Sequence, residues 1–144
     1  MLWRRTIATQ ASPVLLLRIA VGGVFLSEGI QKFLFPSTLG VGRFAKIGIP
    51  APQVMAPFVG VVEIVGGLLL LVGLVARLAA LPLIVDMLVA IATTKIPLLL
   101  KSGFWAMAHE ARVDLTMLLG SVFLLAVGAG SWSIDARLAR GRPA

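Results

Sequence analysis

Four apolar stretches, each long enough to cross a lipid bilayer, constrain the fold of this chain more than any other feature. They cover about residues 13–35, 54–75, 78–100 and 106–127. A helix needs about 20 mainly apolar residues to cross the hydrocarbon core. Helices satisfy their backbone hydrogen bonds within one segment, as the bilayer interior requires. The sequence therefore predicts an all-α, polytopic membrane four-helix bundle, as a single domain over residues 1–144.

Composition and charge support a membrane protein. The chain is 59% hydrophobic and 13% charged, whereas soluble domains carry about 25% charged residues. It has no cysteine, which excludes disulfides, thiolate metal sites and thiol redox chemistry within this chain. The net charge of +7 is spread over tails and loops. We attribute this charge to the orientation of the chain in the membrane and to attraction by lipid headgroups. We expect no nucleic acid as a partner.

The distribution of basic residues near the span ends predicts the orientation. Cytoplasmic termini place six arginines on the inner side, namely Arg4, Arg5, Arg77, Arg137, Arg140 and Arg142. The outer loops then contain Arg43, Lys46 and Lys101, with Lys95 near the outer end of the third span. Because cytoplasmic loops are richer in Lys and Arg, this count favours an N-in/C-in topology.

The first outer loop, residues 38–52, has a helical character of its own. It combines apolar residues with Arg43 and Lys46, and it contains Gly48 and Pro50 after them. Such a pattern is typical of a short amphipathic helix in the membrane interface, ended by the glycine and proline.

Carboxylates interrupt the apolar stretches. A carboxylate at the centre of a membrane helix costs roughly 2.5–3.5 kcal/mol on insertion scales, so it usually has a partner or a function. Five of the six acidic residues lie inside the apolar stretches: Glu28, Glu63, Asp86, Glu110 and Asp114.

Depth along the spans suggests partners for most of these groups. Asp86 and Arg18 lie at comparable depth on the inner side, which predicts a structural ion pair. In the outer half, a polar cluster is predicted from Glu28, Lys32, Lys95, Glu110 and Asp114, with Glu63 just beneath it. This cluster has two interpretations: interhelical salt bridges that fix the bundle, or a functional polar pocket.

Glu63 has no partner that the sequence predicts. It shares a helix face with Gly60 and Gly67, and glycines allow another helix to approach closely. We therefore expect Glu63 to point into the bundle. Its role is either packing, as a paired or protonated group, or ligand binding or proton relay.

His109 is the only histidine. Glu110 and Met107 are near it, but one histidine without cysteine is a weak indication of a metal site. We expect His109 to be an interfacial side chain and predict no metal.

An ordered set of short motifs resembles the DoxX family of small four-helix membrane proteins. The matching segments are Leu17-Arg18, Gly29–Lys32, Phe44 with Gly48–Pro52, Val62–Gly67 with Leu69 and Gly73, Arg77, and Gly128–Asp135. The resemblance implies a multi-pass protein of the cell inner (plasma) membrane that is often linked to redox enzymes. The family's namesake is associated with sulfur and quinone chemistry.

Three functions follow as hypotheses. The first is a membrane subunit of a redox-linked complex, which binds a quinone or docks a soluble or membrane oxidoreductase. We expect such a subunit to be non-catalytic, or active only with its partner, rather than a free-standing enzyme. A quinone is the only cofactor that we consider for it. The second is a small proton-coupled transporter, which with four helices needs a homo-oligomer. The third is a non-catalytic interaction or assembly module.

Overall fold

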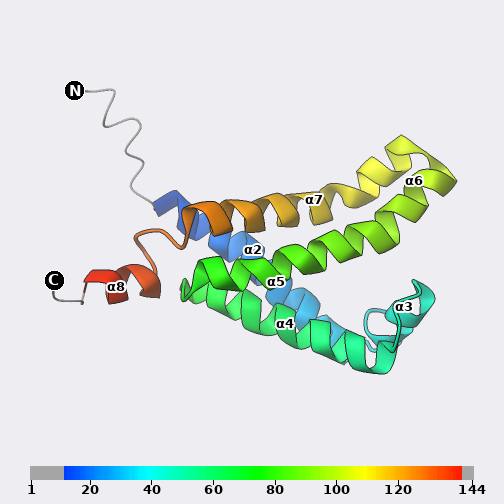
Figure 1. Cartoon of the computed structure of the whole chain (residues 1–144), viewed down its shortest axis with the longest axis horizontal. Coiled ribbons are helices and arrows are strands. Elements are labelled where there is room, and N and C mark those ends of the chain that lie inside the picture. Colours follow the sequence, from blue (N-terminus) through cyan, green and yellow to red (C-terminus); the bar gives the residue numbers. More distant parts are fainter. Residues whose placement is uncertain (1–11, 141–144) are drawn as a thin grey trace.

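The computed structural model describes residues 12–140, which are helical apart from short connections (Figure 1). Its long helices are α2 (Ser12–Leu34), α4 (Pro52–Val72) and α7 (Phe104–Val127). Between α4 and α7, α5 (Ala76–Ala90) continues through the π-helical segment η1 (Ile91–Lys95) into α6 (Ile96–Ser102). Two short helices, α3 (Val41–Lys46) and α8 (Ile134–Arg140), follow α2 and α7. The predicted all-α fold is confirmed over this range.

Three of these helical segments are long and apolar enough to cross a membrane. They are Pro13–Leu34, Pro52–Val72 and Ala76–Ser102. The fourth predicted span, 106–127, does form a helix of 24 residues, α7. Its first half, however, contains Glu110, Arg112 and Asp114, so its passage through the membrane stays a prediction. The N-in/C-in orientation also stays a prediction, and Arg4, Arg5 and Arg142, on which it partly rests, lie outside the described residues.

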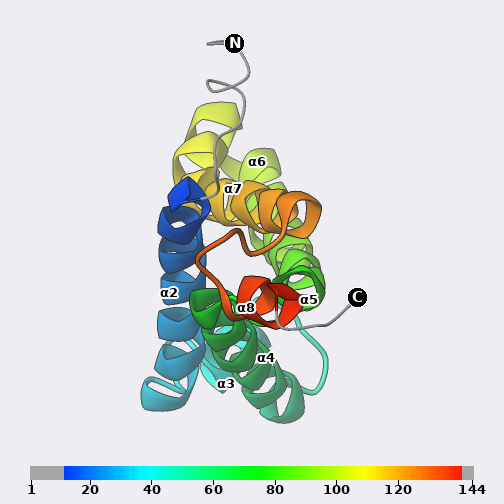
Figure 2. The ribbon, with the colours of Figure 1, turned by 90° about the vertical axis from the view of Figure 1, so that its left-hand side faces the viewer.

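Helices α2 and α4 form one tightly packed antiparallel pair, and α5 packs mainly on α7 (Figure 2). Two glycines of α2 meet two of α4. A Cβ on Gly22 would lie 2.8 Å from the Gly67 carbonyl oxygen, and one on Gly29 would lie 2.6 Å from that of Gly60. The two backbones therefore touch where a larger residue would separate them, as small residues permit in membrane helices. This confirms that Gly60 and Gly67 face a neighbouring helix.

The core is narrow and the outer faces are apolar. Phe25, Leu70, Leu83 and Leu124 are at most 1% exposed. Many leucines, valines and phenylalanines of the same helices face outward, such as Leu16 at 71% exposure. An all-round apolar helix surface of this kind is expected where lipid rather than water is the solvent.

The end of the bundle beside α8 is fixed by side chains that bind backbone groups. Both carboxylate oxygens of Asp135 accept hydrogen bonds from the start of α5, from Val75 N at 2.8 Å and Ala76 N at 3.1 Å. Val75 has a φ of 44°, a conformation that costs energy for a β-branched residue. Asp135 thus caps α5 from a distant segment and stabilises the tight turn between α4 and α5.

Candidate functional site

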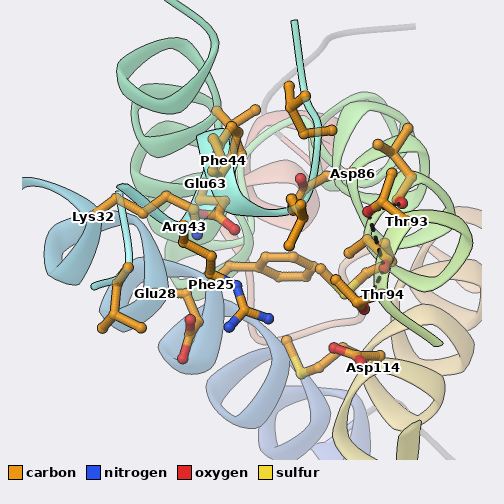
Figure 3. Close-up of a pocket in the computed structure, with 18 of the residues that line it drawn as sticks. Phe25, Glu28, Lys32, Arg43, Phe44, Glu63, Asp86, Thr93, Thr94 and Asp114 are labelled. Carbon is orange, nitrogen blue, oxygen red and sulfur yellow. Dashed lines mark hydrogen bonds and ion pairs between the residues drawn. The ribbon is translucent and has the colours of Figure 1, made fainter. Parts of the chain in front are cut away.

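A cavity of about 310 Å³ lies among the long helices, at the end of the bundle where α3 is found (Figure 3). All four long helical segments contribute side chains to its wall, and α3 and the loop after it close one side. The ring of Phe25 from α2 and that of Phe44 from α3 belong to its apolar lining. Its charged lining residues are Glu28, Lys32, Arg43, Glu63, Asp86, Lys95 and Asp114.

Glu63 has a partner across the α2–α4 interface. Its Oε2 lies 2.6 Å from Lys32 Nζ, and the two side chains are 3% and 11% exposed. The close approach of α2 and α4 at their glycines brings both side chains together. The expectation that Glu63 points into the bundle is confirmed. Its ion pair with Lys32 was not predicted, because it depends on how two helices are rotated against each other.

Asp86 also belongs to this cavity, and the predicted Arg18–Asp86 ion pair is wrong. Asp86 projects from α5 toward the side of the cavity where Glu63 lies (Figure 3). Its carboxyl group lies within hydrogen-bonding reach of that of Glu63, and its buried Oδ2 accepts no hydrogen bond from a nitrogen or hydroxyl group of residues 12–140. Depth along the helix axis, on which the prediction rested, does not determine the side of the helix on which a residue lies.

Arg18 instead binds backbone carbonyl groups at the other end of the bundle. It is 2% exposed. Its Nε and Nη2 donate to the carbonyls of Leu70 and Leu71, each at 2.9 Å. Its Nη1 donates to those of Ala129 and Trp132 at 2.7 and 2.8 Å. Arg18 therefore joins the end of α4 to the segment that follows α7.

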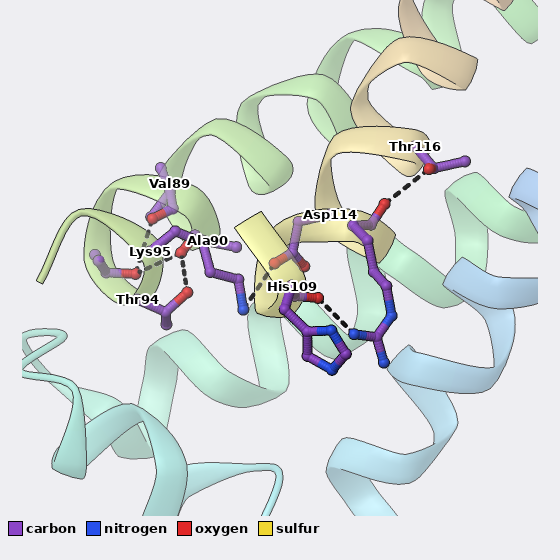
Figure 4. A network of polar contacts seen from close by, with 9 residues as sticks. Val89, Ala90, Thr94, Lys95, His109, Asp114 and Thr116 are labelled. Carbon is purple, nitrogen blue, oxygen red and sulfur yellow. Dashed lines mark hydrogen bonds and ion pairs between the residues drawn. The ribbon is translucent and has the colours of Figure 1, made fainter. Parts of the chain in front are cut away.

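A second ion pair closes the cavity between η1 and α7. Lys95 Nζ lies 2.9 Å from Asp114 Oδ2 (Figure 4). Thr93 and Thr94, also in η1, line the cavity and donate their hydroxyl protons to the carbonyls of Val89 and Ala90. π-helical turns occur frequently at functional sites. The widened turn places three consecutive side chains, 93–95, in the wall.

The remaining members of the predicted outer cluster differ in whether they line the cavity. Glu28 is largely exposed but lines the cavity, whereas Glu110 is exposed and does not. His109 also lies outside the lining, and its carbonyl accepts a hydrogen bond from Arg112. The described part of the chain contains no group of three or more His, Asp or Glu side chains placed to bind a metal ion.

The sequence interpretation missed Asp86, Thr93 and Thr94 as members of one wall, although a signal exists. Thr93 and Thr94 follow Asp86 by seven and eight residues, a spacing that places side chains on one face of a helix. Arg43 was missed for a different reason. The short helix in the first loop forms as predicted, but it packs against α4 and contributes Arg43 and Phe44 to the cavity.

Comparison with known proteins identifies the family. The DoxX family model matches residues 14–96, more than half of the chain. The chain belongs to the DoxX family. Its matched region includes α2 through η1, and so most of the cavity wall of this DoxX-family protein.

Three relatives align over most of their length. "Uncharacterized membrane protein Rv3486" of Mycobacterium tuberculosis is 52% identical over 96% of this chain and 89% of its own. "Putative oxidoreductase CatD" of Bacillus subtilis is 30% identical over 89% of this chain and 88% of its own. An "Uncharacterized protein" of Haemophilus influenzae is 36% identical over 83% of this chain and 85% of its own. No solved structure matches the chain.

Proposed function

We propose that this DoxX-family protein is a membrane subunit of a redox-linked system and binds a quinone-type headgroup in the cavity described above. The observation that supports this most is the composition of the wall. Aromatic and aliphatic side chains, together with convergent charged groups and two threonines, surround a cavity of about 310 Å³ within the bundle. Ligand sites of small molecules commonly start at about 300 Å³ and combine apolar walls with a few polar groups.

The chemistry of a quinone headgroup matches this arrangement. Its flat ring packs against Phe25 and Phe44, while its two oxygens need hydrogen-bonding groups at opposite edges. Arg43 supplies donors at one side, and the Lys32–Glu63 pair supplies both a donor and an acceptor. The isoprenoid tail of such a molecule leaves between apolar helices into lipid.

A redox partner belongs to the proposal. We propose that an oxidoreductase, soluble or membrane-bound, docks on this subunit and exchanges electrons with the headgroup; the chain has no cysteine for thiol redox chemistry of its own. The printed name of the Bacillus subtilis relative, which calls it an oxidoreductase, supports a redox setting. The bacterial inner membrane, where quinones reside, is the proposed location.

The test is the identity of what co-purifies. The protein is purified in mild detergent, extracted with organic solvent, and its quinone content is measured by mass spectrometry against a membrane protein of similar size. We expect close to one quinone per chain for the wild type. Lys32→Met should reduce this severalfold, because it removes a donor of the cavity. Lys101→Met, which changes an exposed lysine outside the cavity, should retain it. Wild-type protein without quinone above the background of the reference protein would contradict the proposal.

A further inference from the structure

Two acidic side chains meet in the wall of the cavity, Glu63 from α4 and Asp86 from α5 (Figure 3). Their carboxyl groups lie within hydrogen-bonding reach of each other. The buried Oδ2 of Asp86 accepts no hydrogen bond from a nitrogen or hydroxyl group of residues 12–140. In this part of the chain, the Glu63 carboxyl group is therefore the hydrogen-bonding partner of Asp86. We call these two groups the carboxyl pair.

A hydrogen bond within the carboxyl pair requires a proton. An ionised carboxylate only accepts hydrogen bonds, whereas a protonated carboxyl group has one O–H that donates. Two ionised carboxylates at this distance would also repel each other, and water screens that repulsion little because the Glu63 side chain is 3% exposed. Closely spaced carboxyl groups in such a setting hold one proton between them. The geometry therefore fits one proton and one negative charge on the pair.

The charges around the carboxyl pair lead to the same count. Four carboxyl groups and three cationic side chains line the cavity. Lys32 faces the pair, and Lys95 pairs with Asp114. The exposed residues Glu28 and Arg43 supply the third charge of each sign. One proton on the pair makes three negative charges face three positive ones, and an uncompensated charge in a partly apolar wall is avoided.

We infer that the carboxyl pair holds one proton and passes it to an oxygen of the ligand when the ligand in the cavity is reduced. This inference rests on the proposed function, because it names the groups that supply a proton to that redox reaction. Both members of the pair line the cavity, so a ligand oxygen can reach them.

The reaction balances with the partner already proposed. Conversion of a quinone-type headgroup to its dihydroxy form takes two electrons and two protons. The electrons come from the docked oxidoreductase, the first proton from the carboxyl pair and the second from water. The pair loses its shared O–H bond as an O–H bond forms at the ring. Both carboxyl groups are then ionised beside Lys32 until the pair takes up a proton from water.

The shared proton is tested first, in the protein without added ligand. Infrared spectroscopy of the detergent-solubilised protein at neutral pH detects the C=O stretch of a protonated carboxyl group, which shifts when H₂O is replaced by D₂O. We expect the signal of about one such group per chain. This wild-type measurement does not depend on the stability of any variant.

Two substitutions assign the signal. Asp86→Asn and Glu63→Gln each replace one member of the pair by an amide, whose N–H donates the hydrogen bond that the proton supplied. The remaining carboxylate then stays ionised beside Lys32, so both variants should lose the signal. Glu110→Gln is the matched control, because it also neutralises one acidic residue on a long helix but lies outside the cavity. It should retain the signal.

The proton transfer is tested with naphthoquinone as the probe and dithionite as the electron source. Calorimetry establishes the concentration that saturates each protein, and stopped-flow absorbance under anaerobic conditions then measures the rate of reduction, with protein-free micelles as the blank. We expect Asp86→Asn to slow the reduction of bound naphthoquinone roughly hundredfold, the lower limit for loss of a positioned acid. Glu110→Gln should react at the wild-type rate.

The outcomes distinguish this inference from the proposed function. A wild-type spectrum without a protonated carboxyl group overturns the inference, while the proposed function stands if quinone co-purifies. A signal that persists in both Asp86→Asn and Glu63→Gln also overturns it, because the proton then lies elsewhere. If Asp86→Asn loses the signal but reduces naphthoquinone at the wild-type rate, the transfer is overturned. If naphthoquinone does not bind the folded wild-type protein, the proposed function fails and the transfer with it.

Discussion

Within residues 12–140, charged side chains are buried at both ends of the bundle, and the two ends are built differently. At the end beside α8, Arg18 binds four backbone carbonyls and every hydrogen bond lies between 2.7 and 2.9 Å. At the end beside α3, charged side chains face one another around a cavity, and the carboxyl groups of Glu63 and Asp86 lie within hydrogen-bonding reach of each other. The charge at the first end binds the backbone, and the charges at the second end surround a cavity.

This difference separates a structural charge from a candidate functional one. A buried polar group whose hydrogen bonds are all made within the chain stabilises the fold and has nothing left to offer a ligand. Charged groups that line a cavity keep hydrogen-bonding capacity that a bound molecule can use. Three substitutions, in order of decreasing expected effect on stability, test whether the two ends differ in this way.

The largest effect is expected at Arg18. Arg18→Met keeps a long side chain but removes all its donors, and with them four hydrogen bonds to backbone carbonyls in buried or partly buried positions. At roughly 1 kcal/mol for each hydrogen bond, the loss should be about 4 kcal/mol. Thermal unfolding in detergent, followed by size-exclusion chromatography, measures it. Arg43→Met is the matched control, because Arg43 is exposed. It should unfold near the wild-type temperature and bind the ligand more weakly. Equal unfolding temperatures for both variants would contradict the comparison.

A smaller effect is expected for the Lys32–Glu63 pair. Lys32→Met leaves Glu63 as an uncompensated buried charge and should cost about 2–3 kcal/mol, somewhat less than a fully buried pair because Lys32 is 11% exposed. The double variant Lys32→Met with Glu63→Leu should recover most of that stability, because both charges are removed. It should nevertheless fail to retain quinone. A double variant whose loss equals the sum of the single losses would show that the two side chains are not coupled.

The smallest effect is expected at the glycine contacts between α2 and α4. A Cβ at Gly22 would lie 2.8 Å from the Gly67 carbonyl oxygen, whereas one at its neighbour Gly23 would meet nothing within 4 Å. Gly22→Ala should therefore force the helices apart and cost about 1–2 kcal/mol. Gly23→Ala should be neutral or stabilising by up to about 1 kcal/mol, since alanine is the better helix former. The two unfolding temperatures check this, and a Gly22→Ala variant as stable as Gly23→Ala would show that the helices do not pack as closely as described.

Within the site, the residues that sequence analysis placed correctly are those whose position depends on one helix alone. Glu63 faces inward because Gly60 and Gly67 share its face, and both contact α2. The helix around Arg43 and Lys46 ends before Gly48, as the amphipathic pattern predicted. In each case, the pattern of residues on one turn or one face of a single segment is enough to predict the position.

The predictions that failed or stayed incomplete required two helices to be placed relative to each other. Arg18 and Asp86 have similar depths, but Arg18 faces α4 and the segment after α7, while Asp86 faces the cavity. A backbone carbonyl as the partner of a buried arginine has no sequence signature, because every residue has one. The same holds for Asp135, whose hydrogen bonds to the start of α5 join residues about 60 positions apart.

The sequence by itself determined that this chain forms apolar helices of bilayer length, that it resembles the DoxX family, and that its embedded carboxylates need partners. Hydrophobicity and local spacing suffice for these statements because both act within a single segment. Only the tertiary structure decided which partners these are. The rotation of each helix about its axis, set where the glycines of α2 meet those of α4, places Lys32 against Glu63 and leaves Asp86 beside a cavity.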